Sequence, residues 1–433
     1  MHSNAPVSPH FAHAARTALA VKLAYARSLD WFVERCPAIV KVQDATSLRQ
    51  LAVLELEGEG EERLTLTELA EFSHRAPGGG LTLTSGGSTG GKKQITHSWL
   101  FHQSIMALGG RGFAAAAGRP TVLLNCLTAG EMQGAFLFAC GVAEQLGVRV
   151  LPAGWAMHPA QLVDLIATHQ VDTLVATPSF AAAFLGDEKL PRARLVTLRQ
   201  VLFIGEAFSA ERRQHLVARF PELVIRSLGY SSTETGPIGF QCGYLADNQY
   251  HLHADVMHVE VLDPESLQPV AEGAAGELVV TPLLPDHVPL FRYRIGDLGQ
   301  LHSQPHPCAC GSPFPLLTLL GRAELSIKLG GAIITQRQVL SVLRKIAPEL
   351  TVEDVQVQYT MHELGGVLLT LALSDCAFPP TAGTLVSAAL ANDEYAHMLL
   401  KLPGVAGLNV VLCPVTEFRY NCAGKRPFFI QTE

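Results

Sequence analysis

The spacing of apolar residues changes along the chain, and each spacing predicts a different kind of element. Apolar residues recur at helix spacing from Arg16 to Val33 and again from Leu64 to Phe72, where a Thr-rich start is suited to capping a helix. After residue 120, short apolar runs typical of buried strands alternate with helical segments. The expected strands cover residues 121–127, 148–153, 171–178, 200–203 and 224–228, and the expected helices cover 135–147, 158–170 and 210–220. This alternation predicts βαβ units around a parallel sheet.

Beyond Gly239 the pattern becomes rich in short strands separated by Pro, Gly and Asp. Strands are expected over residues 258–263, 276–284 and 291–301. From about Glu324, further strands (355–360, 366–373, 408–415) combine with helices (336–347, 384–400). We therefore predict an α/β fold with two domains. Residues 1–323 form a large domain with parallel βαβ sheets and a small β-rich subdomain, and residues 324–433 form a small, mobile α+β domain.

Composition narrows the class of protein. The 433 residues are 48% hydrophobic and only 16% charged, which excludes intrinsic disorder. The net charge of −7, without a basic run, argues against nucleic acid as a partner. The longest apolar run, Gly134–Ala143, is too short to cross a bilayer, and the N-terminus lacks the pattern of a secretory signal, so no membrane association and a cytoplasmic setting are predicted. Nine cysteines favour reduced thiols or a metal site over a disulfide framework.

The first candidate for chemistry is a loop rich in Gly, Ser and Thr, running from Thr84 to Lys93 (TSGGSTGGKK). Glycines let a polyphosphate approach the backbone, amide and hydroxyl groups donate hydrogen bonds, and lysine supplies charge. The loop is not the Walker pattern, because Gln94 follows Lys93 where that pattern has Ser or Thr. The alternative interpretation is a mobile surface loop.

Four further motifs follow in order. Leu228–Gly236 (LGYSSTETG) brings together an aromatic face able to stack on a base and a carboxylate able to hold Mg²⁺. Phe291–Leu298 (FRYRIGDL) places an Asp at the end of a β-run, where it would accept from ribose hydroxyls or else close a turn. The others are Gly321–Gly331 (GRAELSIKLGG) and Gly424–Lys425, and each is weak by itself.

Taken together, the five motifs resemble, in order and separation, those of the adenylate-forming superfamily of acyl- and aryl-CoA ligases, luciferases and peptide-synthetase adenylation domains. The resemblance runs from Thr84 to Lys425. It implies that ATP, with Mg²⁺, activates a carboxylic acid as an acyl-adenylate, and that a thiol then attacks the mixed anhydride.

The resemblance also implies a role for each matching residue. The residues implied to cradle the β- and γ-phosphates of ATP are Ser85, Ser88, Thr89, Gly90 and Lys93. Tyr230 would stack on adenine, Thr233 would touch the α-phosphate, and Glu234 would hold Mg²⁺. Gly205 and Glu206 would line the adenine pocket, and Asp297, assisted by Arg322, would bind the ribose. Glu324 would be the hinge residue, and Lys425 would stabilise the charge that develops during adenylation.

The compact layout, with the phosphate loop beginning at Thr84, resembles the phenylacetate-CoA ligase branch. That resemblance points to a cysteine, a short His-containing stretch and a Cys-x-Cys-Gly pair, which here are Cys242, His251, Cys308 and Cys310. Three thiolates and an imidazole suit a structural Zn²⁺, with His251 preferred to His253 as the fourth ligand. The alternative is that the cysteines are reduced loop thiols.

The acyl pocket leaves the weakest pattern. Candidate lining residues are Glu131, Ser179 and Gly205; Glu131 would either bind a substrate amine or face solvent. The predicted function is an AMP-forming ligase that passes a small, aryl carboxylic acid to coenzyme A. Two alternatives stay open for the acceptor, which would be the phosphopantetheine of an acyl carrier protein or an amine. A further alternative is a nucleotide-binding regulatory protein without catalytic activity. The branch resemblance also suggests a homodimer.

Overall fold

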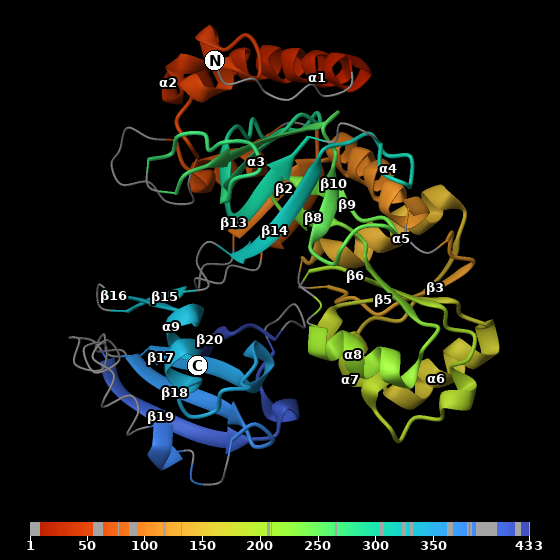
Figure 1. Cartoon of the computed structure of the whole chain (residues 1–433). Coiled ribbons are helices and arrows are strands. Elements are labelled where there is room, and N and C mark those ends of the chain that lie inside the picture. The colour runs from red at the N-terminus through yellow and green to blue at the C-terminus, as the bar shows by residue number, and fades with distance from the viewer. Residues whose placement is uncertain are drawn as a thin grey trace. The chain divides into compact units, whose positions relative to one another are not determined.

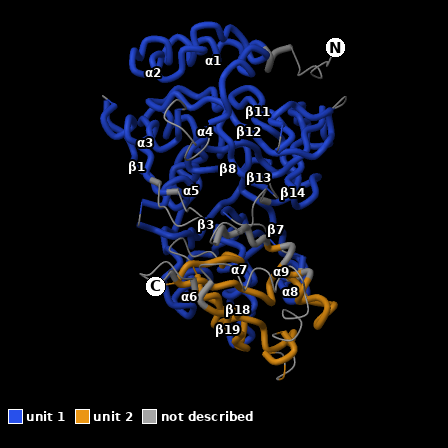
Figure 2. Tube along the Cα trace, turned by 90° about the vertical axis from the view of Figure 1, so that its left-hand side faces the viewer, with its two compact units in different colours: residues 1–85, 92–321 blue, residues 86–91, 322–433 orange. Residues whose placement is uncertain are grey.

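The computed structural model describes most of the chain. The described residues are 9–54, 64–76, 78–85, 93–115, 118–130, 132–205, 208, 210–264, 266–303, 307–322, 326–329, 332–361, 367–378, 381, 383–386, 405–420 and 426–432. The chain forms two compact units: unit 1 comprises Met1–Ser85 and Lys92–Gly321, and unit 2 is mainly Arg322–Glu433 (Figure 2). The sequence analysis sets its boundary between residues 323 and 324. In the described ranges, no helix combines the length and apolar character that a membrane span needs.

Unit 1 begins with a group of short helices. They are α1 (Pro9–Arg27), α2 (Asp30–Arg35), α3 (Leu66–Arg75) and the 3₁₀ turns Pro37–Lys41 and Ser47–Gln50. The helical spacing over Arg16–Val33 is divided between α1 and α2, because the chain turns at Leu29, which has extended backbone angles. The Arg27 guanidinium holds this turn by donating to the Ile39 carbonyl at 3.2 Å. The predicted cap of α3 is confirmed: Thr65 and Glu68 form a reciprocal capping box.

A five-stranded parallel sheet is the centre of unit 1, as predicted from the βαβ pattern. Its order is β4-β3-β5-β6-β7, from the strands Arg149–Pro152, Val122–Asn125, Thr173–Ala176, Gln200–Phe203 and Val224–Ser227. The helices around it are α4 (Trp99–Ala115), α5 (Gly134–Leu146), α6 (Pro159–His169), α7 (Pro178–Gly186) and α8 (Ala210–Arg219), with a 3₁₀ turn at Arg192–Arg194. Neighbouring strand residues join different cores, Leu123 with α5 and Leu124 with α6, α7 and α8. Both faces are therefore covered (Figure 1), which explains the continuous apolar runs of its strands.

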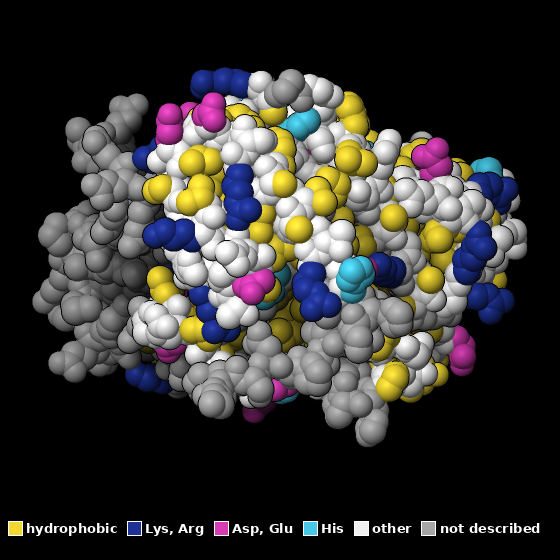
Figure 3. Space-filling model, turned by 90° about the horizontal axis from the view of Figure 1, so that it is seen from above, with side chains coloured by type: hydrophobic (Ala, Val, Ile, Leu, Met, Phe, Trp, Pro, Cys, Tyr) yellow, Lys and Arg dark blue, Asp and Glu magenta, His cyan; other side chains and the backbone are white. Residues whose placement is uncertain are grey.

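The β-rich part of unit 1 is one seven-stranded sheet with the order β11-β12-β13-β14-β10-β9-β8. Its strands are β8 (Tyr230–Ser232), β9 (Gly236–Phe240), β10 (Gln249–Leu252), β11 (Met257–Leu262), β12 (Gly276–Pro282), β13 (Tyr293–His302) and β14 (Leu316–Arg322). A separate hairpin, β1 (Gly80–Ser85) and β2 (Lys93–Ser98), flanks the glycine-rich loop. From above, charged and hydrophobic side chains of unit 1 intermingle (Figure 3).

Unit 2 has its own core around a four-stranded sheet with the order β19-β18-β17-β20. Its elements are β15 (Ser326–Leu329), β16 (Ala332–Thr335), α9 (Gln336–Leu343), β17 (Val355–Met361), β18 (Val367–Ser374), β19 (Val405–Cys413), β20 (Phe429–Thr432) and the 3₁₀ turns Val352–Asp354 and Val415–Glu417. Apolar side chains of α9 and the sheet, such as Leu343 and Leu371, share this core. The fold is thus α/β, with an α+β second unit. Most of the helix predicted over residues 384–400 lies outside the described residues.

Candidate functional site

Two of the sequence motifs meet directly in unit 1. Tyr230, the first residue of β8, donates its hydroxyl hydrogen to Asp297 Oδ2 at 2.6 Å. Asp297 was expected at the end of a strand or in a turn, and that expectation is wrong, because it lies inside β13. There the register with β12 shifts and Gly296 has φ +79°, a β-bulge that turns the Asp297 side chain out of the regular alternation. The predicted adenine and ribose residues therefore lie side by side.

The segment that carries Thr233 and Glu234 is fixed by a buried histidine of β2. His97 Nε2 lies 2.8 Å from the Thr233 carbonyl oxygen, and Nδ1 lies 2.6 Å from Asp286 Oδ2. Both partners are acceptors, so both ring nitrogens face groups to which they can donate. Glu234 is buried, and Gly236 has φ +71° with Ile105 Cγ2 only 2.8 Å from where a Cβ would stand. A glycine is required to end this turn.

The sequence did not reveal the His97–Asp286 pair. The two residues lie 189 positions apart in the sequence. Asp286 is held in turn, since its Oδ1 accepts from the backbone N–H of Ser98 at 2.8 Å. No local sequence pattern predicts such a long-range pair.

The ends of the predicted phosphate loop are paired in the hairpin. Ser85, the last residue of β1, pairs with Lys93, the first residue of β2. The two ends of the loop therefore lie next to each other on paired antiparallel strands. Arg322 ends β14. The predicted residues that lie outside the described part of the chain are Ser88, Thr89, Gly90, Glu131, Glu206, Glu324 and Lys425. Of the remaining pocket candidates, Ser179 is buried in the first turn of α7, and Gly205 follows β6 with φ +94°.

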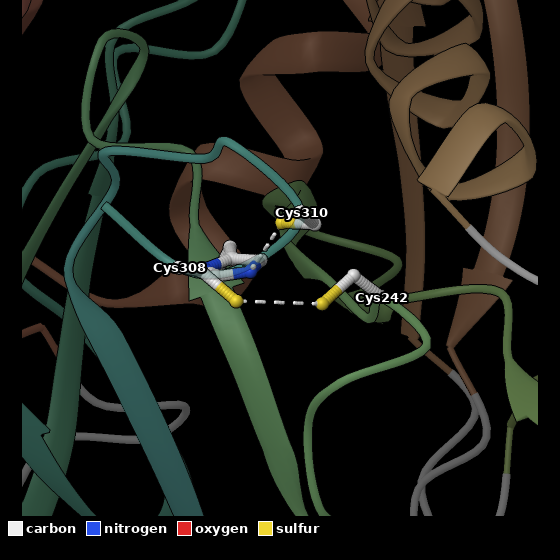
Figure 4. A group of neighbouring side chains, drawn as sticks. Cys242, Cys308 and Cys310 are labelled. Atoms are coloured by element: carbon white, nitrogen blue, oxygen red, sulfur yellow. Dashed lines mark hydrogen bonds between the residues drawn. The ribbon is translucent and has the colours of Figure 1, made fainter.

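Four predicted metal ligands converge in unit 1. Figure 4 shows Cys242, which follows β9, facing Cys308 and Cys310 of the loop before β14. Together with His251 of β10, their ligand atoms all lie within 4.8 Å of one another. The measured separations are 3.8 Å between the Sγ atoms of Cys242 and Cys308, and 3.3 Å between Cys310 Sγ and His251 Nε2. Gly311, with φ +85°, allows the tight turn that aims Cys308 and Cys310 at the same point.

This donor set fits a tetrahedral zinc ion. Zinc–sulfur bonds of ~2.3 Å at tetrahedral angles set the sulfurs ~3.8 Å apart, and a sulfur and an imidazole nitrogen ~3.6 Å apart. The 3.8 Å and 3.3 Å separations match these values, whereas a disulfide would need about 2.05 Å. Burial raises the pKa of the Cys242 thiol to about 12, so a thiolate there calls for a nearby cation.

The other histidine of this stretch, His253, lies outside the cluster and has a different partner. Arg111 of α4 donates from Nη1 to His253 Nδ1 at 3.1 Å and holds Asp255 with both guanidinium nitrogens, at 2.9 and 2.6 Å. Burial, and secondarily the Arg111 charge, lower the pKa of His253 to about 3, against an opposing effect of Asp255. The Phe240 ring lies between the two histidines, with centroids 5.1 Å from His251 and 5.2 Å from His253.

A small cavity in unit 1 adjoins these groups. It has only about 10 Å³, roughly the room for one water molecule, and lies between α4, α5, the end of β6 and strands β8 and β9. Gly229 and Ser231, on either side of Tyr230, form one wall, and His253 forms another. The cavity therefore adjoins the predicted nucleotide-binding segment.

Comparison with known proteins agrees with the motifs. Residues 80–282 match the family model described as AMP-binding enzyme. The chain is 30% identical to a phenylacetate-coenzyme A ligase of Thermus thermophilus over 249 residues, which cover 55% of this chain and 54% of that protein. It is 28% identical to a phenylacetate-coenzyme A ligase of Escherichia coli over 164 residues, 37% of each protein.

The matched stretches thus span about half or less of these curated relatives. The fold likeness extends further. The structure of 2-hydroxyisobutyryl-CoA ligase in complex with 2-HIB-AMP and CoA matches 97% of this chain and 90% of that chain, with a TM-score of 0.61 at 18% identity. Residues 80–282 thus match the AMP-binding enzyme family, and over about half of its length the chain is similar to phenylacetate-coenzyme A ligases.

Proposed function

We propose that this protein is an AMP-forming ligase that activates a small, aryl carboxylic acid with ATP and transfers the acyl group to the thiol of coenzyme A. The observation that carries the proposal is the Tyr230–Asp297 hydrogen bond, because it joins two separate motifs into one surface suited to a nucleoside. The curated relatives named as phenylacetate-coenzyme A ligases support the acid and the acceptor. A carrier protein as acceptor has weaker support, from a D-alanine–D-alanyl carrier protein ligase of Listeria monocytogenes that is 26% identical over 205 residues.

In this proposal the chain's residues act on charge and orientation. The Tyr230 ring stacks on adenine, while the carboxylate of Asp297 accepts from the ribose hydroxyls. Attack of the acid's carboxylate on the α-phosphorus builds negative charge on the phosphate oxygens, and Lys425 and Thr233 stabilise that charge. Glu234 would hold Mg²⁺, which would supply charge neutralisation at the phosphates when ATP is bound. Pyrophosphate leaves, and the coenzyme A thiolate then attacks the acyl carbon and releases AMP.

The tight hold on the Thr233 carbonyl supports this division of roles. His97 fixes the backbone of the segment through a carbonyl, so the side chains of Thr233 and Glu234 stay available to ligands. Preorganised groups of this kind stabilise charge without reorganisation during the reaction. The proposal further includes a swing of unit 2 about Glu324 between the two half-reactions.

The test is pyrophosphate exchange with ATP, Mg²⁺ and a panel of aryl, aliphatic and amino acids, followed by thioester assays with coenzyme A. We expect exchange with aryl acids, and thioester only when coenzyme A is added. Exchange confined to amino acids would contradict the proposed substrate class. Normal ATP binding without exchange for every acid would favour a regulatory protein.

We also propose that Cys242, His251, Cys308 and Cys310 hold a structural zinc ion. The support is the convergence of four soft or imidazole ligands at tetrahedral separations, from strand β10, the segment after β9 and the loop before β14. Zinc there would bind the loop before β14 to strands β9 and β10, which carry the cavity wall. We propose no catalytic part for it, because four protein ligands leave a zinc ion no open position for substrate.

Metal analysis of the purified protein tests the zinc proposal. We expect about one zinc per chain and a fall of several degrees in the melting temperature of Cys308→Ser, because a structural zinc contributes folding free energy directly. The matched control is Cys376→Ser, an exposed cysteine of unit 2 outside the cluster, which should keep both zinc and stability. Full stability of Cys308→Ser without zinc would contradict the structural role.

A further inference from the structure

Two residues outside the sequence motifs, Asp286 and His287, contact both sides of the hairpin that flanks the glycine-rich loop. They lie in the segment between β12 and β13. Asp286 Oδ1 accepts from the backbone N–H of Ser98, the last residue of β2, at 2.8 Å. His287 Nε2 lies 3.0 Å from the carbonyl oxygen of Gly79, just before β1. Because Gly80 pairs with Ser98, the two residues hold both strands at the same end of the hairpin.

His97 connects Asp286 to the segment of Thr233 and Glu234. Asp286 Oδ2 lies 2.6 Å from His97 Nδ1, and His97 Nε2 lies 2.8 Å from the Thr233 carbonyl oxygen. The side chains of His97 and Asp286 are only 2% and 5% exposed. The Phe101 ring stacks on the imidazole with centroids 4.3 Å apart, which fixes the plane of the ring. One carboxylate thus joins the hairpin to the segment assigned to the α-phosphate and Mg²⁺.

The two ring nitrogens of His97 have different consequences. The contact of Nδ1 with Asp286 satisfies a buried carboxylate, and a buried charge that loses its partner destabilises the fold. The contact of Nε2 holds a backbone carbonyl next to Glu234. A segment that is already ordered does not need to be ordered again when a ligand binds, which increases affinity. We therefore expect the first contact to act mainly on stability and the second mainly on ligand affinity.

We propose that Asp286 and His97 are positioning residues for ATP. Asp286 orients the imidazole, and the Nε2–H group of His97 holds the Thr233 carbonyl, so that Thr233 and Glu234 are preordered for the triphosphate and its Mg²⁺. The proposal rests on the proposed function and deepens it, because it adds to the ATP site a carboxylate that lies outside every motif. Both residues act through the backbone of Thr233.

Two isosteric variants of His97 separate the two contacts. In His97→Asn, the side-chain amide takes the place of Nδ1 and still donates to Asp286, but it does not reach Thr233. In His97→Gln, the amide takes the place of Nε2 and still donates to the Thr233 carbonyl, but the contact with Asp286 is lost. Calorimetric titration with Mg²⁺-ATP measures the affinity of each variant, and urea unfolding measures its stability.

The two measurements should rank these variants in opposite orders. We expect His97→Asn to raise the Kd for Mg²⁺-ATP about five- to tenfold, as the loss of one hydrogen bond implies, and His97→Gln to raise it less than about twofold. His97→Gln should unfold at the lower urea concentration, because Asp286 loses its partner. Equal Kd values for the two variants, or affinities that follow stability, would overturn the proposal, since a purely structural role predicts that result.

The matched control is His74→Asn. His74 is an exposed histidine whose Nδ1 lies 2.8 Å from Thr96 Oγ1, on the same strand β2. This variant should change neither the Kd for Mg²⁺-ATP nor the urea midpoint by a large factor. A rise in Kd equal to that of His97→Asn would overturn the proposal, because it would show that any change on this strand weakens ATP binding.

Two variants of Asp286 test the carboxylate. Asp286→Asn keeps an oxygen that accepts from Ser98 and an amide that donates to His97 Nδ1, so it should retain most of the affinity for Mg²⁺-ATP. Asp286→Leu leaves the imidazole without its orienting partner and should raise the Kd as much as His97→Asn does. Wild-type affinity in a folded Asp286→Leu would overturn the role of Asp286.

Failure of this proposal can be distinguished from failure of the ligase function. ATP binding by the wild-type protein without pyrophosphate exchange for any acid contradicts the ligase function, and the Kd values of the variants still decide the positioning role. Exchange with aryl acids together with equal Kd values for His97→Asn and His97→Gln contradicts the positioning role alone. Absence of ATP binding by the wild-type protein would overturn both.

Discussion

Replacement of Lys22 by methionine should stabilise the protein at neutral pH. Lys22 belongs to α1, is 6% exposed, and has its ammonium group 5.1 Å from the centroid of the Phe291 ring. Burial lowers its pKa from 10.5 to about 8, although the charge of Asp286 partly opposes this shift. At ~1.36 kcal/mol per pKa unit, keeping the lysine charged costs roughly 3 kcal/mol. Loss of the cation–π contact offsets about 1 kcal/mol, which leaves a gain of about 2 kcal/mol.

The sign of the pH dependence follows from this lowered pKa. Between about pH 8 and 10.5 the unfolded chain binds the lysine proton and the folded chain does not, so the stability of the wild type rises with pH there. Below pH 8 the cost of the buried charge is fully present, and above pH 10.5 it vanishes. The advantage of Lys22→Met should therefore shrink as the pH increases through this window.

Urea unfolding followed by tryptophan fluorescence measures the effect, because Trp31 of α2 packs on Phe72 close to α1 in the chain. We expect the free energy of unfolding of Lys22→Met to exceed that of the wild type by about 2 kcal/mol at pH 7, and the difference to be mostly lost at pH 10. The matched control is Lys41→Met, an exposed lysine, which should change little. The same difference at both pH values, or a destabilised variant at pH 7, would refute the reasoning.

Three further predictions concern the site. His97→Leu should lower the free energy of unfolding by about 3 kcal/mol, measured in urea, because it leaves the buried Asp286 without its main partner; an unchanged value would show that the pair is dispensable. Asp297→Asn should raise the KM for ATP far more than the KM for the acid in exchange assays, and equal increases would place Asp297 outside the ribose site. Lys425→Ala should suppress adenylate formation but spare thioester formation from preformed acyl-AMP; equal loss of both would make the lysine structural.

Local sequence patterns predict those parts of the fold that depend on neighbouring residues. The parallel strands follow from apolar runs that are buried on both faces, and the start of α3 follows from Thr65 and Glu68, three residues apart. The pattern of apolar residues does not predict the break between α1 and α2, because the helical spacing continues through α2 and both helices pack into the same core. The helix ends where Leu29 takes extended backbone angles, and Arg27 donates to the Ile39 carbonyl across the turn.

The same difference between local patterns and long-range contacts applies to the candidate site. Resemblance of motifs suggested that Tyr230 and Asp297 act together, and the structure adds their hydrogen bond and the bulge at Gly296 that permits it. The bonds of His97 and His253 have no local signal, since their partners lie 189 and 142 positions away. Long-range pairs of this kind are set by the packing of whole elements.

The central claim is that the chain forms an acyl-adenylate from an acid and ATP and passes the acyl group to coenzyme A. One time course measures it most directly: pyrophosphate and acyl-CoA release are followed together with ATP, Mg²⁺ and an aryl acid, before and after coenzyme A is added. Our account predicts little pyrophosphate beyond one equivalent per chain at first. After the addition, pyrophosphate and acyl-CoA should then form continuously in equal amounts. Continued ATP binding with no pyrophosphate from any acid, or pyrophosphate that never yields acyl-CoA, would contradict the account.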